Sequence, residues 1–162
     1  MRLGVRECLL GGRIVPGDVS VADGAITEVG VSPAAKHGLA VPGFIDIQVN
    51  GFAGVDFSFT DVDGYRIAAG AMAPTGVTSY QPTFICLPPD AYEPALQVAA
   101  DAQRTITTPR LLGVHLEGPF LSPRRIGAHD PANTRDPDPD WVDRMLGSGI
   151  VTYTTIAPEL PG

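Results

Sequence analysis

The sequence predicts an α/β protein in which a short β-rich segment precedes a parallel sheet, and three observations support this fold class. Near-continuous apolar runs such as VPGFIDIQVNG (41–51) alternate with stretches of helical periodicity. Polar residues gather at the ends of these runs. The 19 glycines and 16 prolines are scattered as punctuation, which suits many short elements joined by tight loops. Strands that alternate with helices indicate βα units, and their parallel strands are expected to be buried on both faces.

The first forty residues predict small β-hairpins. GRIV (12–15), DVSVADG (18–24) and AITEVG (25–30) are short alternating runs. Asp23-Gly24, between the last two runs, is a typical hairpin-turn dipeptide. We therefore expect a tight hairpin centred on this pair.

From Val41 onward the apolar runs predict four buried strands, at 41–51, 76–86, 110–118 and 149–159, with helices at 62–73, 89–106 and 138–146. Four βα units make about half of a (β/α)₈ barrel, which typically needs ~250 residues. In such a half-barrel we expect Phe44, Ile45, Val114 and Leu116 to lie in the inner layer and to be uncovered.

The predicted strands end in polar or special residues. In chain order these are Gln48 and Asn50, Gln81 and Thr83, His115 and Glu117, and Pro158-Glu159. Residues i and i+2 of a strand point the same way, so each pair shares a face. Because active sites of parallel α/β folds lie at the carboxyl ends of the strands, these side chains predict a site there.

Composition excludes several classes of protein. The net charge of −7 argues against a nucleic-acid or anionic-membrane partner, since both require basic surface. No apolar stretch approaches the ~18 residues of a membrane helix, and the start lacks the features of a secretory signal. The two cysteines, Cys8 and Cys86, are far apart with no metal-binding spacing. We therefore expect a reduced, cytoplasmic protein.

Several motifs resemble one enzyme family. VPGFIDIQVNGFAGVDF (41–57), GVTSYQPTFI (76–85), HLEGPF (115–120) followed by GAH (127–129), and TIAPE (155–159) are similar to the N-acetylglucosamine-6-phosphate deacetylases of the amidohydrolase superfamily. The resemblance implies that residues 1–40 form part of a small β-sandwich domain. It implies equally that residues 41–162 form the first half of a metal-dependent hydrolase TIM barrel.

The resemblance also implies an activity and residue roles. The family removes acetate from N-acetylglucosamine 6-phosphate with one divalent metal ion, zinc or iron, that activates water. Glu117 matches the carboxylate metal ligand, while His129 and the backbone of Ala128 match the sugar contacts. The family's two metal-binding histidines and its catalytic aspartate come from later strands, so no catalytic residue is expected within this chain. The intact enzyme is expected to be a homo-oligomer, a dimer.

Other polar residues are less specific. Gln48-Val49-Asn50 stands where many amidohydrolases have His-x-His, and Gln48 is expected to hold the metal-bound water or the substrate. Asn50 and His115 are possible site-lining residues, although each could equally be a hydrogen-bonded group at a barrel rim or in the core. Arg124 and Arg125 suit phosphate or a solvated turn, and His37 is expected to be exposed.

Two alternatives stay open. The chain could derive from a different amidohydrolase, although the missing His-x-His argues against it. It could also be a non-catalytic fragment with an interaction role. On the family assignment we expect an N-terminal piece of the enzyme that is inactive alone.

Overall fold

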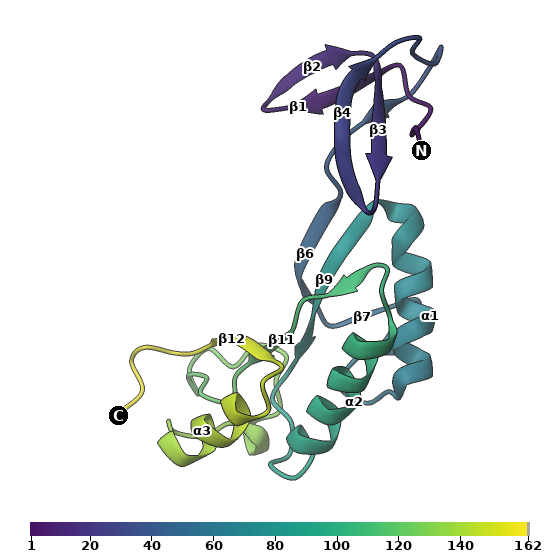
Figure 1. Cartoon of the computed structure of the whole chain (residues 1–162). Helices are drawn as coiled ribbons and strands as arrows, with labels where there is room; N and C mark the ends of the chain where they lie inside the picture. Colours follow the sequence, from purple (N-terminus) through teal and green to yellow (C-terminus); the bar gives the residue numbers. More distant parts are fainter. Residues whose placement is uncertain (162) are drawn as a thin grey trace. The chain divides into compact units, whose positions relative to one another are not determined.

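The computed structural model describes residues 1–161, which form two compact units (Figure 1). Unit 1 comprises Met1–Gly43 and unit 2 begins at Phe44. Unit 1 is built from short β-strands, whereas unit 2 alternates strands with helices. This is the order of elements that the sequence predicts.

Unit 1 contains two small sheets. Strands β1 (Glu7–Leu10), β2 (Arg13–Pro16) and β5 (Leu39–Ala40) form one sheet in the order β2-β1-β5. Strands β3 (Asp18–Ala22) and β4 (Ala25–Val31) form an antiparallel hairpin. Its turn residues Asp23 and Gly24 both have positive φ, 51° and 74°, as a two-residue hairpin turn of the favoured twist requires. The hairpin predicted at this pair is confirmed.

A buried carboxylate ties the N-terminal residues of unit 1 to β3. Asp18 is 3% exposed. Its oxygens accept hydrogen bonds from the backbone N–H groups of Gly4, Val5 and Val19, and Arg2 Nε lies 3.0 Å from Oδ2. Burial of a charge is tolerated only when it is paired and hydrogen-bonded, as it is here.

The sheet of unit 2 is parallel and follows the predicted βα order. Its strands are β6 (Phe44–Val49), β9 (Val77–Phe84), β10 (Arg110–Leu111), β11 (Val114–Glu117) and β12 (Val151–Thr155). Strand β9 pairs with β6, β10 and β11, and β11 pairs with β12, so β6 and β12 are the edges. The ribbon β7 (Gly51–Phe52) and β8 (Val55–Asp56) follows β6.

Three helices connect these strands: α1 (Val62–Met72), α2 (Tyr92–Thr105) and α3 (Pro139–Gly147). Short 3₁₀ helices occupy Ala73–Thr75 and Pro131–Asn133. The Asp61 carboxylate caps α1 by accepting from Gly64 N–H, and the Asp138 carboxylate caps α3 by accepting from the N–H groups of Asp140 and Trp141. These caps fix the helix starts close to the predicted residues.

The two faces of the sheet differ in character. Val114 and Leu116 of β11 are 0% and 1% exposed and belong to the apolar core that includes the helices. Because alternate residues point to opposite faces, His115 and Glu117 lie on the other, inner face. The prediction that Val114 and Leu116 form an uncovered inner layer is therefore wrong, since they pack on the helical side.

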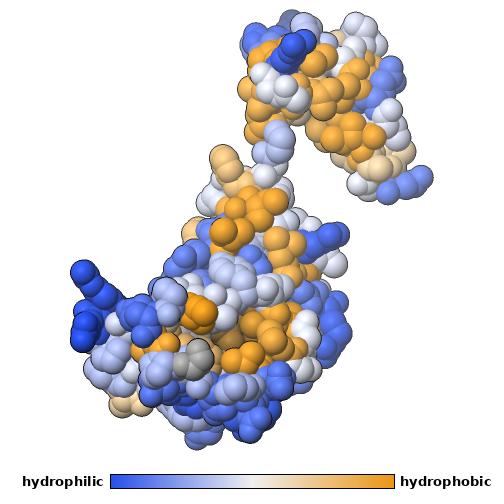
Figure 2. Space-filling view, turned by 90° about the vertical axis from the view of Figure 1, so that its left-hand side faces the viewer, coloured by the Kyte–Doolittle hydropathy of each residue, from blue (hydrophilic) through white to orange (hydrophobic). Residues whose placement is uncertain are grey.

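The edge strand β6 is not buried on both faces, although parallel strands were expected to be. On β6, Phe44, Ile45 and Ile47 are 66%, 62% and 58% exposed. The prediction of exposure is thus confirmed for Phe44 and Ile45, and Figure 2 shows how much apolar surface the molecule presents. An edge strand lacks the neighbour that would cover it, which is why composition alone overestimates its burial.

Candidate functional site

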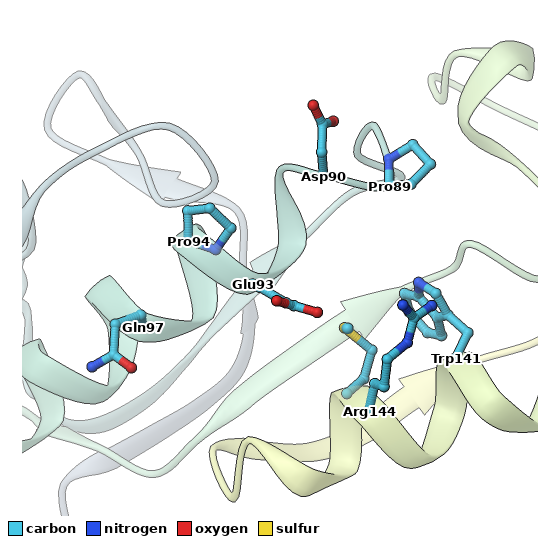
Figure 3. Close-up of a pocket in the computed structure, with 8 residues that line it drawn as sticks. Pro89, Asp90, Glu93, Pro94, Gln97, Trp141 and Arg144 are labelled. Carbon is cyan, nitrogen blue, oxygen red and sulfur yellow. The ribbon is translucent and has the colours of Figure 1, made fainter.

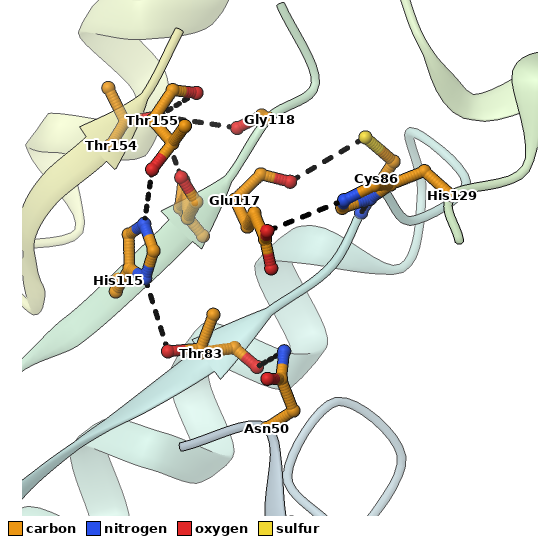
Figure 4. Close-up of polar contacts among 10 residues, drawn as sticks. Asn50, Thr83, Cys86, His115, Glu117, Gly118, His129, Thr154 and Thr155 are labelled. Carbon is orange, nitrogen blue, oxygen red and sulfur yellow. Dashed lines mark hydrogen bonds and ion pairs between the residues drawn. The ribbon is translucent and has the colours of Figure 1, made fainter. Parts of the chain in front are cut away.

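The site lies where the carboxyl ends of β9 and β11 meet the loop between β11 and α3. Glu117 ends β11, and His129 comes from the loop. His129 Nε2 lies 3.6 Å from Glu117 Oε1, and their side chains are 8% and 26% exposed. The structure therefore brings together the two residues that the sequence assigned to the metal and to the sugar (Figure 4).

A pocket of about 450 Å³ opens beside this pair. It is lined by Asn50, Ile85, Glu117, Leu121, Arg125, Ile126, Gly127, Ala128, His129 and Thr155. Its walls thus come from the ends of four strands, β6, β9, β11 and β12, and from the loop, and they combine a carboxylate, an imidazole, an amide and a guanidinium. Such a mixture of apolar wall and few polar groups is typical of a small-molecule site.

The ring of His129 is hydrogen-bonded on the side that faces away from Glu117. The backbone N–H of Cys86, just after β9, donates to His129 Nδ1 at 3.2 Å. The backbone N–H of His129 donates to the Ile126 carbonyl at 3.3 Å, which closes the turn of the loop. The side chain is consequently fixed with Nε2 toward Glu117.

His115 is occupied on both ring nitrogens. Nδ1 lies 3.1 Å from Thr83 Oγ1, and Nε2 lies 2.8 Å from Thr155 Oγ1. The ring also stacks on Tyr153, with centroids 4.1 Å apart. Burial lowers the pKa of His115, partly opposed by the nearby Glu117 carboxylate, so its imidazole is neutral at pH 7. With both nitrogens engaged, His115 has no lone pair free for a metal, and only its partner Thr155 reaches the pocket.

The two amides at the end of the first predicted strand, Gln48 and Asn50, lie in different places. Asn50 lines the pocket, and its Nδ2 donates to the Thr83 carbonyl at 3.4 Å. Gln48 is exposed and is not among the residues that line the pocket. The structure thus brings Asn50, but not Gln48, to Glu117 and His129.

The basic turn divides in the same way. Arg125 lines the pocket, whereas Arg124 is exposed and lies near Glu159, whose pKa is lowered chiefly by its own backbone N–H and by the Ser122 hydroxyl, with a smaller effect of Arg124. His37 is exposed in unit 1, as expected.

Sequence reasoning missed three contributors. Thr155 lines the pocket although the fourth strand was expected to end at Pro158-Glu159; β12 ends at Thr155 itself. Cys86 acts through its main chain, which no side-chain pattern reveals. Asn133, whose Nδ2 donates to the Cys86 carbonyl at 3.3 Å, lies in a loop with no recognisable spacing.

The polar groups of residues 1–161 supply part of a metal site at most. No three His, Cys, Asp or Glu side chains of this range converge as metal ligands. Cys86 is buried, and burial raises the pKa of its thiol to about 11, which disfavours the thiolate that a metal would bind. Glu117 is the one carboxylate among the residues that line the pocket.

A larger hollow of about 710 Å³ lies elsewhere, between α2 and α3 (Figure 3). Its lining residues are Pro89, Asp90, Glu93, Pro94, Gln97, Trp141, Arg144 and Met145. None of the predicted site residues reaches it. We therefore place the chemistry in the smaller pocket.

Among the described residues, no helix is long and apolar enough to span a bilayer.

Comparison with known proteins shows which proteins the chain resembles. No protein-family model matches the chain. The N-acetylglucosamine-6-phosphate deacetylase of Homo sapiens is 37% identical over 132 residues, which is 75% of this chain and 32% of that protein. The N-acetylgalactosamine-6-phosphate deacetylase of Escherichia coli O157:H7 is 32% identical over 149 residues, covering 88% of this chain and 40% of that protein.

Among solved structures, a mutant of the Mycobacterium smegmatis N-acetyl-D-glucosamine-6-phosphate deacetylase in complex with N-acetyl-D-glucosamine-6-phosphate superposes with a TM-score of 0.86 at 31% identity. The match covers all of this chain and 44% of that one. The chain thus spans about a third to two fifths of its curated relatives. The fold class predicted from the sequence is confirmed for this N-terminal part.

Proposed function

Because the chain matches the N-terminal portion of N-acetylglucosamine-6-phosphate deacetylases, we propose that it contributes part of the active site of such an enzyme. The reaction is hydrolysis of the acetamide of N-acetylglucosamine 6-phosphate to glucosamine 6-phosphate and acetate. The observation that carries the proposal is the convergence of Glu117 and His129, 3.6 Å apart, in a pocket at the carboxyl end of a parallel sheet.

Within that reaction we assign Glu117 as one carboxylate ligand of a divalent ion, zinc or iron. Such an ion activates water and polarises the amide carbonyl when bound. A catalytic zinc site needs about three protein ligands, and no three His, Cys, Asp or Glu side chains of residues 1–161 converge to hold a metal ion. The residues present therefore do not form the metal site by themselves, and no step through the ion follows from them.

The other pocket residues are assigned to the substrate. His129 and the backbone of Ala128 contact the sugar, and Asn50 and Thr155 line the wall beside it. Arg125 is the cationic side chain of the pocket and suits the phosphate. The galactosamine-6-phosphate relative makes N-acetylgalactosamine 6-phosphate the second candidate substrate.

A chimera tests this proposal. Residues 1–161 replace the matching part of the Mycobacterium smegmatis enzyme, and acetate release and bound metal are measured with both acetylated sugar phosphates. We expect metal-dependent acetate release. Glu117→Gln should lose bound metal and most activity together, because a charged ligand is removed. His129→Ala should keep the metal and chiefly raise KM.

The matched control is Gln97→Ala, in the hollow between α2 and α3, which should leave both readouts unchanged. A folded, metal-loaded chimera that releases no acetate would overturn the assignment. Loss of metal in His129→Ala would show that its role is wrong. For the 162-residue chain alone we expect acetate release equal to a no-enzyme control.

We also propose a homodimeric, cytoplasmic parent enzyme. Both Cys8 and Cys86 are free and buried, as is usual in a reducing compartment. Light scattering of the active chimera tests the dimer.

A further inference from the structure

The backbone N–H and the backbone carbonyl of Cys86 are both hydrogen-bonded to the loop that carries His129. Its N–H donates to His129 Nδ1 at 3.2 Å, and its carbonyl accepts from Asn133 Nδ2 at 3.3 Å. Figure 4 shows Cys86 and His129 side by side next to Glu117. The loop is therefore fastened to the end of β9 through the backbone of one residue.

This contact decides where the proton of His129 lies. A backbone N–H can only donate, so Nδ1 must offer its lone pair. A neutral imidazole has a single N–H, which is then on Nε2. Nε2 faces the Glu117 carboxylate, which only accepts. Both neighbours of the ring thus favour the same tautomer.

We propose that the Cys86 main chain locks His129 in the Nε2–H tautomer and that Asn133 is the positioning residue that holds Cys86 in place. His129 then presents a hydrogen-bond donor to the ligand in the pocket, which must offer an acceptor oxygen such as a sugar hydroxyl or a carbonyl. It offers no lone pair to a metal ion. Only the identity of the ligand rests on the proposed function.

Asn133 is well placed for this role because its own position is fixed. It ends the 3₁₀ helix Pro131–Asn133, where the Asp130 side chain accepts from Ala132 N–H at 2.9 Å. The backbone N–H of Asn133 donates to the Asp130 carbonyl at 3.0 Å. The Cys86 side chain takes no part in these contacts with His129 and Asn133, since its Sγ contacts the Glu117 carbonyl instead.

Solid-state ¹⁵N NMR of the histidine-labelled 162-residue chain tests the tautomer and does not require a monomer. The signals of His129 are identified by their loss in His129→Gln. We expect an unprotonated Nδ1 and a protonated Nε2. A protonated Nδ1, or an equal mixture of the two tautomers, would overturn the proposal.

Asn133→Asp tests the positioning residue, because an ionised carboxylate of nearly the same shape cannot donate to the Cys86 carbonyl. In this variant we expect the Nδ1 signal of His129 to shift toward the average of the two tautomers. Thr134→Ala is the control: it removes a bond to the Pro131 carbonyl in the same loop but none to Cys86, and it should leave the signal in place. Trp141 fluorescence verifies that each variant is folded.

An unchanged signal in Asn133→Asp would remove Asn133 from the proposal. An equal shift in Thr134→Ala would show a general loosening of the loop and would also contradict it. These outcomes are independent of acetate release by the chimera, so failure of the enzyme assignment and failure of the tautomer lock are distinguishable.

Discussion

The two units of the chain are stabilised in different ways. Unit 2 encloses a large apolar cluster in which Leu116, Tyr80 and Phe84 are at most 1% exposed. Among residues 1–43, only Cys8 and Val19 are buried apolar side chains, and the most connected buried group is the Asp18 carboxylate. Hydrophobic burial scales with the area removed from water. We infer that packing holds unit 2, whereas polar contacts hold much of unit 1.

An apolar pocket in unit 1 sharpens the contrast. It measures about 250 Å³ and is lined by side chains of both small sheets. Cys8 and Val19 both border it. The few buried apolar residues of unit 1 therefore border an open pocket.

The largest effect is expected in the core of unit 2. Leu116→Ala removes a fully buried side chain, and the cavity should lower the free energy of unfolding by about 2–5 kcal/mol. Urea unfolding followed by the single tryptophan, Trp141, which is buried in the same core, measures it. Ile67→Ala, at a side chain 60% exposed on α1, is the control and should change stability by about 0.5 kcal/mol at most. Equal losses in the two variants would refute the packing account.

A smaller effect is expected on the inner face of the same sheet. Thr83→Val preserves shape but removes the hydroxyl that contacts His115 Nδ1, which leaves a buried ring nitrogen unpaired. We expect the free energy of unfolding, measured by the same fluorescence assay, to fall by about 1–3 kcal/mol. Thr78→Val makes the same change at an exposed site of β9, where the loss should be only a few tenths of a kcal/mol. If the two substitutions cost the same, the His115 contact contributes nothing.

In unit 1 the sensitive group is Asp18, and its effect depends on pH. Hydrogen bonds, chiefly from Val5 N–H, lower the pKa of Asp18 despite its burial, with further help from Val19, Arg2 and Gly4. A lowered folded-state pKa means that this stabilisation is present above the unfolded value of about 4 and is lost as the pH falls through the folded value.

Amide hydrogen exchange measures the consequence. At pH 7, Asp18→Asn should reduce the protection of the Val5 and Val19 amides. The parent should approach the variant as the pH falls below about 4. Asp23→Asn, in the exposed hairpin turn, serves as the control and should keep normal protection. Equal protection in Asp18→Asn and the parent at pH 7 would show that the carboxylate does not hold this region.

The smallest effect is expected for the apolar part of unit 1. Cys8→Ala deletes a buried sulfur, but the site borders an existing pocket. Little new cavity is created, so the protection of nearby amides should fall by less than about 1 kcal/mol. A larger loss than in Asp18→Asn at pH 7 would reverse the comparison between the units.

Local patterns predicted most elements of this fold because they act over few residues. Asp23-Gly24 marks its turn in the sequence. In the structure, the Asp61 and Asp138 carboxylates cap the starts of two predicted helices through contacts within three residues. The exposure of Phe44 and Ile45 was predicted from the half-barrel and not from their hydrophobicity, because burial depends on what lies beside an edge strand.

The candidate site divides in the same way. Glu117, His129, Ala128 and Asn50 were predictable as pocket residues from motifs and strand ends, although their chemical roles remain predictions. Gln48 was misplaced relative to the pocket because it lies within β6, whereas Asn50 follows the end of the strand, where side chains no longer keep its alternation. The Cys86 contact was hidden because a backbone N–H is common to every residue except proline.

His115 links Thr83 to Thr155 through its two ring nitrogens. This chain of three groups has a property that His129, with its single tautomer, lacks. Each of the partners of His115, Thr83 and Thr155, carries a hydroxyl that can either donate or accept. The chain of three groups can therefore reverse its hydrogen-bond direction by rotating two hydroxyls and exchanging the tautomer, with every heavy atom in place. The wall of the pocket at Thr155 can thereby turn from donor to acceptor, so one side of the site adapts its polarity to the ligand while the opposite side, at His129, keeps its polarity fixed.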